Sequence, residues 1–212
     1  MTISQKAVNS IVSFEVSSPG NYLKLYQHPM YAGGDSGITI GIGYDCGYNT
    51  KDQIQSDWGD LLPKDSVDLL KSVAGLKKLY AEHSVHTVSS ISIPYETAIK
   101  VFLQKTLKRF SIVTISAFPK VDELMPDAAG ALLSLVYNRG GNTDPSNDRR
   151  KEMHAIKDLV VKKDYNGIAE QLESMKRLWN DSQNGLRIRR DAEADLVRHA
   201  VREYKQDELI NI

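Results

Sequence analysis

The sequence lacks several features that would assign a protein to a specialised class. It has one cysteine, Cys46, so an intrachain disulfide is excluded and stability must come from a buried core. Lysine plus arginine and aspartate plus glutamate are equal at 27 each, which argues against a general nucleic-acid binder. The histidines show no spacing with acidic or cysteine partners that is typical of a metal site. We therefore expect no metal and no other cofactor, and we interpret Cys46 as a bystander.

Long hydrophobic runs are also missing. No stretch of about 18 apolar residues occurs, and residues 1–15 lack the uninterrupted apolar segment of a signal peptide. We expect the chain to fold in the cytoplasm, or to leave it by a route that does not read such a signal. With 41% hydrophobic and 25% charged residues, the composition is that of a soluble globular protein, large enough for one domain or a core split into two lobes.

The hydrophobic pattern changes along the chain. Residues 4–15 have the apolar spacing of an amphipathic helix, and Pro19 with Gly20 ends it. Residues 22–48 alternate and contain the turn cluster GGDSG, which predicts a β-hairpin. From Thr50 onward the pattern is helical. The sequence predicts an α+β fold, with a small β-rich lobe over about 16–93 and a mainly helical lobe over about 94–212 that includes the first helix.

Three helical signals organise the second part of the chain. Thr50 and Gln53 are spaced as a capping box. Pro94 precedes a periodic segment over 95–118, whose length of about 36 Å could join two lobes. Pro126 begins a helix that is small or apolar all round, which indicates burial. Three further helices are predicted at 149–164, 166–179 and 188–204, with breaks at 165–167 and 180–185.

The stretch DSGITIGIGYD, residues 35–45, is the most unusual part of the sequence. As a strand it would place four large side chains on one face: Ile38, Ile40, Ile42 and Tyr44. The other face is nearly bare: Thr39, Gly41, Gly43 and Asp45. Glycine in a strand often marks close approach by a ligand. Thr39 and Asp45 could hold a water there, but only if the glycines bend the chain, because six residues of straight strand span about 20 Å.

Two other carboxylates are candidates. Glu15 lies at the end of the first helix, in line with its apolar stripe. A partly buried carboxyl group keeps its proton more readily because desolvation disfavours the charged form, and a protonated glutamate can act as a general acid. The alternative is that Glu15 lies in solvent where the helix ends. Asp35 lies in the turn cluster, where aspartate ordinarily makes an Asx-turn.

Polar residues at the end of the buried helix form a further candidate site. Asn138 and Arg139, followed by two glycines, could hydrogen-bond a sugar or a carboxylate. Equally, this segment could be a helix C-cap with a solvated arginine. The arginines of the last predicted helix, Arg187, Arg189 and Arg190, are interpreted as an ion-pair array with Glu193.

Together these motifs resemble the phage-type lysozymes, muramidases that cut peptidoglycan. The resemblance covers residues 4–198 and includes the glutamate that closes the first helix, the TIGIG strand, the long helix, the buried helix ending in VYNRGG, and Trp179 followed by an arginine-rich helix. It implies a single lysozyme-like domain over 1–212. The TIGIG motif with an upstream glutamate is the most specific part.

The resemblance also implies roles for individual residues. Glu15 matches the general acid, and Thr39 matches the threonine that helps to place the water. The phage enzymes carry their aspartate nine residues after the glutamate, where this chain has Lys24. Some bacterial muramidases of the same fold, the bacteriocin pesticin among them, have it six residues after the threonine. Asp45 matches that spacing, so it is favoured over Asp35.

These matches predict an inverting muramidase, with Asn138 and Arg139 lining the substrate cleft. Two alternatives remain, a lytic transglycosylase and a catalytically silent module that binds wall glycans or a protein. An endolysin and an antibacterial effector or bacteriocin toxin are both compatible with the sequence. The expected partners are peptidoglycan strands and, for a toxin, an immunity protein; the chain is expected to be monomeric, without a transmembrane segment, and to act at the cell wall of a target cell.

Overall fold

The computed structural model describes residues 1–212. Its contacts divide the chain into two compact units: unit 1 comprises Met1–Phe14 and Lys108–Ile212, and unit 2 comprises Glu15–Leu107. The chain is mostly helical with two small antiparallel sheets, so the predicted α+β class is confirmed. No helix is both long and apolar enough to cross a bilayer.

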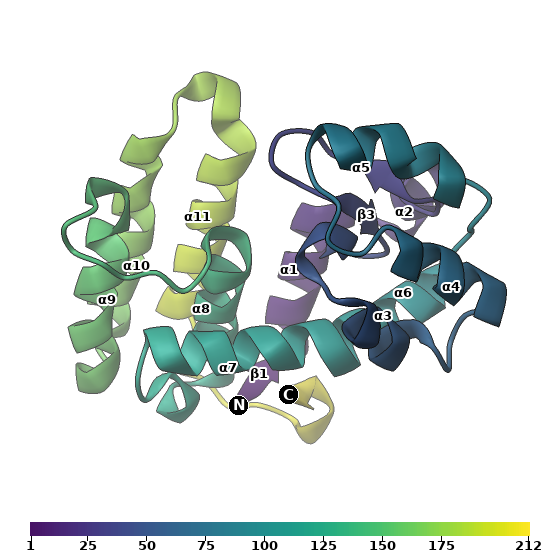
Figure 1. Cartoon of the computed structure of the whole chain (residues 1–212). Coiled ribbons are helices and arrows are strands. Elements are labelled where there is room, and N and C mark those ends of the chain that lie inside the picture. Colours follow the sequence, from purple (N-terminus) through teal and green to yellow (C-terminus); the bar gives the residue numbers. More distant parts are fainter. The chain divides into compact units, whose positions relative to one another are not determined.

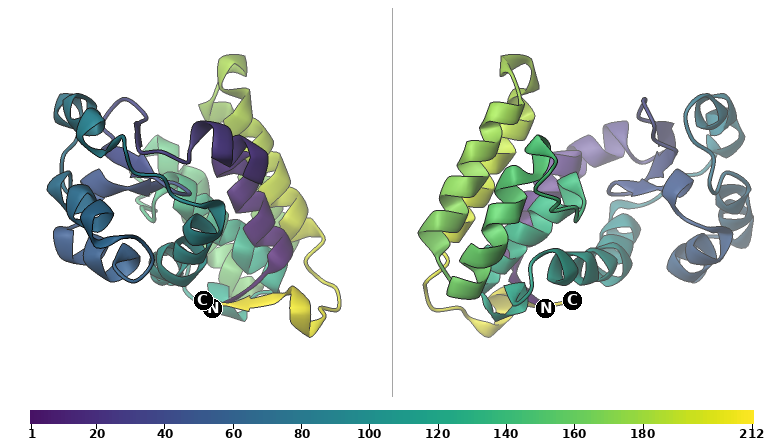
Figure 2. Two further views of the ribbon diagram at one scale, coloured as in Figure 1. Left: turned by 90° about the vertical axis from the view of Figure 1, so that its right-hand side faces the viewer. Right: turned by 60° about the vertical axis from the view of Figure 1, so that its left-hand side comes forward.

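The two ends of the chain pair with each other in unit 1. Strand β1 (Thr2–Ser4) lies antiparallel to β5 (Leu209–Asn211), and the amino group of Met1 donates to the carbonyl of Ile212 at 2.9 Å. Figure 2 shows the two termini side by side. The sequence analysis did not predict this sheet, because strands of three residues are too short to show a period of two.

Four helices pack side by side to form most of unit 1 (Figure 1). They are α8 (Pro126–Arg139), α9 (Lys151–Lys162), α10 (Tyr165–Ser174) and α11 (Asn184–Arg198). Helix α8 is buried over residues 127–136, as predicted. At Gly130 a side chain would lie 2.3 Å from Cβ of Ala7 in helix α1 (Gln5–Val16), so glycine lets these two helices touch.

The ends of the last helices differ from the prediction. Residues 165–167 do not form a break, because the Asp164 side chain accepts from the amide of Gly167 at 2.9 Å and caps α10 at Tyr165. Helix α11 begins at Asn184, inside the predicted loop, and ends at Arg198 rather than at residue 204. Short helical turns connect these elements: η4 (Val121–Glu123), η5 (Asp148–Arg150), η6 (Met175–Leu178), η7 (Asp181–Gln183) and η8 (Gln206–Glu208).

Unit 2 has a sheet surrounded by short helices. The helices are α2 (Pro19–Leu25), α3 (Lys51–Trp58), α4 (Lys64–Ser72), α5 (Leu79–Ser84), α6 (Tyr95–Val101) and the turns η1 (Cys46–Tyr48) and η2 (Val85–Val88). Three antiparallel strands form the sheet: β2 (Met30–Tyr31), β3 (Ile38–Ile40) and β4 (Tyr44–Asp45). Thr50 caps α3 by accepting from the amide of Gln53 at 3.1 Å, as its spacing predicts.

The prediction of a β-hairpin over 22–48 is wrong in its first part. Residues 22–25 belong to α2, because Ser18 accepts from the amide of Asn21 at 3.1 Å and Pro19 occupies the first helical turn. These local signals outweigh a five-residue alternation. The remaining strands are three rather than two, and they begin at Met30.

The predicted long helical segment is confirmed over residues 95–117. It runs through α6, a π-helical turn η3 (Phe102–Thr106) and α7 (Leu107–Ala117) without interruption. The boundary between the two units falls inside it, after Leu107. Residues 94–107 thus group with unit 2, where the Tyr22 hydroxyl donates to the carbonyl of Ile93 at 3.0 Å and the Tyr22 ring packs edge-on against Tyr95.

Candidate active site

A sharp bend between β3 and β4 brings Thr39 and Asp45 together. Gly41 and Gly43 have φ values of +57° and +66°, a region that glycine adopts at little cost. The chain reverses at these glycines, and Thr39 becomes the direct register partner of Asp45. Directly opposite residues of an antiparallel pair have Cβ atoms about 4.5–5.5 Å apart. The bend that the two glycines were predicted to allow is therefore present.

The Asp45 carboxylate is held by backbone amides. The amide of Gly37 donates to both carboxylate oxygens at 3.0 Å, and the amide of Gly47 donates to Oδ1 at 2.7 Å. The Asn49 side chain donates to the Asp45 carbonyl at 2.7 Å. A carboxylate has about four lone-pair sites, so one site on Oδ2 remains for a water. These hydrogen bonds hold the Asp45 carboxylate in one orientation and connect it to Gly37 and Gly47. We call this set of hydrogen bonds the Asp45 brace.

Two glycines that the sequence analysis did not single out make this brace possible. A Cβ atom on Gly37 would lie 2.4 Å from both Asp45 Oδ1 and Gly47 Cα. A Cβ atom on Gly47 would lie 2.7 Å from Gly37 Cα. Only glycine at both positions lets the two amides reach one carboxylate. The available signal was the Asp-x-Gly spacing of residues 45–47, which is typical of a side chain that bonds its own backbone two residues on.

Large side chains anchor the opposite face of the hairpin. Those predicted to point into the core are all buried: Ile38, Ile40, Ile42 and Tyr44. The Tyr44 hydroxyl donates to Asp57 at 2.9 Å, and its ring packs edge-on against Trp58 at 5.4 Å between centroids. This apolar layer holds the strand that carries Thr39. The prediction that Gly41 lies on the opposite, bare face is wrong, because Gly41 is buried and a Cβ atom on it would lie 3.0 Å from the Trp58 ring.

Asp35 lies apart from this arrangement. Its side chain is 79% exposed and forms an ion pair with Lys78 at 3.1 Å. The turn that contains it is closed by Ser36, whose amide and hydroxyl both donate to the Gly33 carbonyl. Asp35 is a turn residue, as predicted, but its carboxylate does not make the expected Asx-turn.

Glu15 belongs to the same compact unit as Thr39 and Asp45. It lies one residue before the end of α1 and is half-buried, while the apolar stripe of that helix is buried at Ile11 and Val16. The two units divide the helix immediately before Glu15. All three proposed catalytic side chains are thus carried by unit 2.

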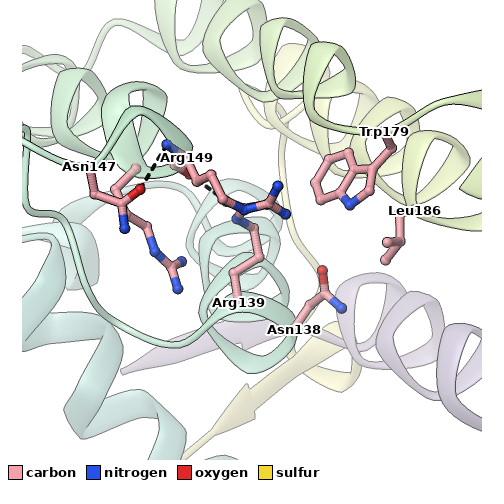
Figure 3. A pocket seen from close by; sticks show the side chains of 7 residues that line it. Asn138, Arg139, Asn147, Arg149, Trp179 and Leu186 are labelled. Atoms are coloured by element: carbon pink, nitrogen blue, oxygen red, sulfur yellow. Dashed lines mark hydrogen bonds between the residues drawn. The ribbon is translucent and has the colours of Figure 1, made fainter. Parts of the chain in front are cut away.

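Asn138 and Arg139 line a pocket in unit 1. The pocket has a volume of about 400 Å³, and its remaining lining residues are Asn147, Arg149, Arg150, Trp179 and Leu186 (Figure 3). Arg139 lies at the end of α8 and donates to the carbonyl of Arg149, while its guanidinium lies 5.0 Å from the Trp179 ring centroid. Gly140 caps the end of helix α8 with φ of +74°, as one of the two alternatives proposed, but the Arg139 side chain contacts Arg149 and Trp179 instead of extending into solvent.

The arginines of α11 form a buried network. Arg189 and Arg190 both bond Oε1 of Glu193, at 3.3 and 2.8 Å, and Ser134 of α8 donates to the same oxygen at 2.6 Å. The predicted ion-pair array is confirmed for these residues, and its burial shows that it joins α11 to α8. Arg187 is different, because it pairs with Asp181 at 3.4 Å.

No group of three or more histidine, cysteine, aspartate or glutamate side chains is arranged to hold a metal ion. No protein-family model and no curated protein sequence matches this chain.

Proposed function

We propose that this protein is a lysozyme-like muramidase. It hydrolyses the β-1,4 bond between N-acetylmuramic acid and N-acetylglucosamine in peptidoglycan. The observation that carries the proposal is the register pairing of Thr39 and Asp45 on β3 and β4, within the unit that also carries Glu15. The roles of Glu15, Thr39 and Asp45 are assigned from the resemblance to the muramidase motifs.

Three side chains perform the reaction. Glu15 donates a proton to the leaving oxygen of N-acetylglucosamine as the glycosidic bond breaks. A water that Thr39 and Asp45 hold attacks the anomeric carbon of N-acetylmuramic acid from the opposite face and gives its proton to Asp45. This route inverts the anomeric configuration, and it requires carboxyl groups about 6.5–9.5 Å apart.

The choice of Asp45 as the base rests on its surroundings. Its carboxylate is fixed by two amides and keeps an acceptor site on Oδ2, whereas Asp35 is exposed and paired with Lys78. Lys24, at the position of the phage enzymes' aspartate, offers hydrogen-bond donors instead of a carboxylate and lies exposed in the last turn of α2.

Zymography on purified peptidoglycan tests this proposal. Wild type and Asp35→Asn are expected to clear the gel, while Glu15→Gln and Asp45→Asn are expected to leave it intact. Circular dichroism of each variant checks that it is folded. A folded wild type without activity, or full activity in Glu15→Gln, would overturn the assignment. Mass spectrometry of the products separates hydrolysis from a lytic transglycosylase, which leaves anhydro ends.

The brace around Asp45 supports a second candidate, a module that binds wall glycans or a protein partner without catalysis. Three hydrogen bonds from the backbone amides of Gly37 and Gly47 give Asp45 a structural role that does not depend on catalysis. This alternative predicts that the wild-type protein sediments together with insoluble peptidoglycan but releases no soluble fragments from it. It also predicts that Glu15→Gln and Asp45→Asn leave biological activity unchanged.

The place where the protein would act follows from the proposed substrate. We propose that it acts at the cell wall of a target cell, as an endolysin or as an antibacterial effector or toxin. A toxin of this kind needs an immunity protein in the cell that makes it. Expression in the cytoplasm compared with expression behind an added export signal tests this, since only the exported form is expected to lyse its host.

A further inference from the structure

The pocket of unit 1 concentrates positive charge. Three of its seven lining residues are arginines, and none is an aspartate or glutamate: Asn138, Arg139, Asn147, Arg149, Arg150, Trp179 and Leu186. An ordinary surface arginine faces solvent or pairs with a carboxylate. Here Arg139 bonds only a backbone carbonyl, that of Arg149, and stacks near an indole ring.

The Arg139 guanidinium is incompletely satisfied. Its Nε is buried without a hydrogen-bond partner. Burial first, and then the charges of Arg150 and Arg190, lower its pKa to about 10, which means that its surroundings disfavour the positive charge. An anion that entered the pocket would offset the electrostatic repulsion between these guanidinium groups.

One buried carboxylate acts on the charge of Arg139 from outside the pocket lining. Glu152 is the one acidic residue that favours the charged form of Arg139. It is itself buried, and its Oε1 accepts from Arg177 at 2.6 Å. Arg177 also bonds Asp148. One oxygen of this carboxylate is therefore bonded to another arginine, the other has no hydrogen-bond partner, and no carboxylate lines the pocket itself.

The apolar part of the lining favours an organic carboxylate over inorganic phosphate. Arginine binds both anions through two parallel hydrogen bonds, so the guanidinium groups alone do not select between them. Trp179 and Leu186 offer apolar surface beside the guanidinium groups, suited to the carbon atoms next to an organic carboxylate. Asn138, whose side-chain oxygen accepts from Arg190 at 3.3 Å, keeps its amide group for a neighbouring carbonyl.

We propose that this pocket binds a carboxylate group of the peptidoglycan substrate, which rests on the function proposed above. Peptidoglycan offers two sources of this group, the carboxylates of the peptide stems and the lactyl carboxylate of muramic acid where the stem has been removed. The pocket would make the protein prefer an anionic wall polymer over a neutral glycan such as chitin.

Nuclear magnetic resonance of the two tryptophan indoles tests the pocket directly. The chain has two tryptophans, of which Trp179 lines the pocket and Trp58 lies in unit 2, so Trp58 serves as an internal control. Full-length protein is titrated separately with a wall stem tripeptide, with N-acetylmuramic acid, with inorganic phosphate and with neutral N-acetylglucosamine. We expect the first or second probe to shift the Trp179 signal saturably and leave the Trp58 signal in place.

A charge-matched pair of variants completes the test. Arg149→Gln removes a lining guanidinium but keeps the carbonyl that Arg139 bonds, and we expect it to weaken carboxylate binding about tenfold. Lys162→Gln removes an exposed charge at the far end of α9 and should bind as wild type does. No carboxylate-dependent shift, equal binding by both variants, or tighter binding of phosphate would each overturn the inference.

The outcome is separable from that of the proposed function. If carboxylates shift the Trp179 signal but the protein leaves peptidoglycan intact, the carboxylate-binding pocket is supported and the muramidase function is contradicted. If the protein cuts peptidoglycan but no carboxylate shifts the Trp179 signal, the muramidase function is supported and the carboxylate-binding pocket is contradicted.

Discussion

Thr39 and Asp45 occupy directly opposite positions on β3 and β4, although five residues separate them along the chain. The hydroxyl of one and the carboxylate of the other therefore share a face of the hairpin, and two left-handed glycines create the turn between them. The backbone amides of Gly37 and Gly47 hold the carboxylate by hydrogen bonds. This geometry is suited to fixing a water, and it can be tested one residue at a time.

Thr39→Ala should reduce the proposed muramidase activity by about 100-fold or more, the smaller end of the range that positioned acid–base groups contribute. The substitution removes the hydroxyl that orients the water and leaves the amide brace of Asp45 in place. Turbidity loss of a peptidoglycan suspension measures the effect. Thr39→Ser keeps the hydroxyl and should retain most activity; equal activity in Thr39→Ala and wild type would show that the hydroxyl has no such role.

Asp45→Ala should destabilise the protein by about 1–3 kcal/mol or more, because the buried amides of Gly37 and Gly47 lose their acceptor. Urea unfolding followed by circular dichroism gives the free energy. Asp35→Ala is the matched control. Asp35 is 79% exposed, so its loss should change the free energy of unfolding by less than about 0.5 kcal/mol. Similar values for the two variants would contradict the brace.

Two glycine-to-alanine substitutions should have opposite effects. Gly37→Ala places a methyl group 2.4 Å from Asp45 Oδ1 and Gly47 Cα, so the loop must shift and both stability and activity should fall. Gly20→Ala lies in α2 with its nearest neighbour at 3.9 Å, and the better helix propensity of alanine should raise the free energy of unfolding by up to about 1 kcal/mol. Thermal unfolding separates the two, and a stabilised Gly37→Ala variant would rule out the close approach.

Cys46 should resist thiol reagents in the folded protein. Burial, followed by the charge of Asp45, raises the pKa of its thiol from 9.0 to about 12. Above pH 9 the unfolded chain loses this proton while the folded chain keeps it, so the stability that the buried thiol contributes is present below pH 9 and declines as the pH rises toward 12.

Labelling with a chromogenic disulfide at pH 8 should be slow in buffer and fast in urea. Between pH 8 and 10, wild type should lose more stability than Cys46→Ala does. Fast labelling of the native protein would contradict the burial of this side chain.

Local signals in the sequence determined most of the helices. A capping side chain, a proline at the first turn or a long apolar period acts over a few residues, so Thr50, Pro94 and Pro126 place their helices correctly. The same local physics explains two errors. Ser18 with Pro19 makes a helix of a segment that alternates like a strand, and Asp164 caps α10 at a place interpreted as a loop.

For the candidate site, the sequence determined which large side chains are buried and where the chain can turn, because side-chain alternation and the freedom of glycine are properties of the local backbone. Only the tertiary structure decided what those residues contact. The hydrogen bond from Gly37 to Asp45, the pairing of Asp35 with Lys78 and the gathering of arginines around Trp179 join residues whose separation in the chain carries no periodic signal. Such contacts depend on how the whole core packs, since the same short segment can meet different neighbours in different folds.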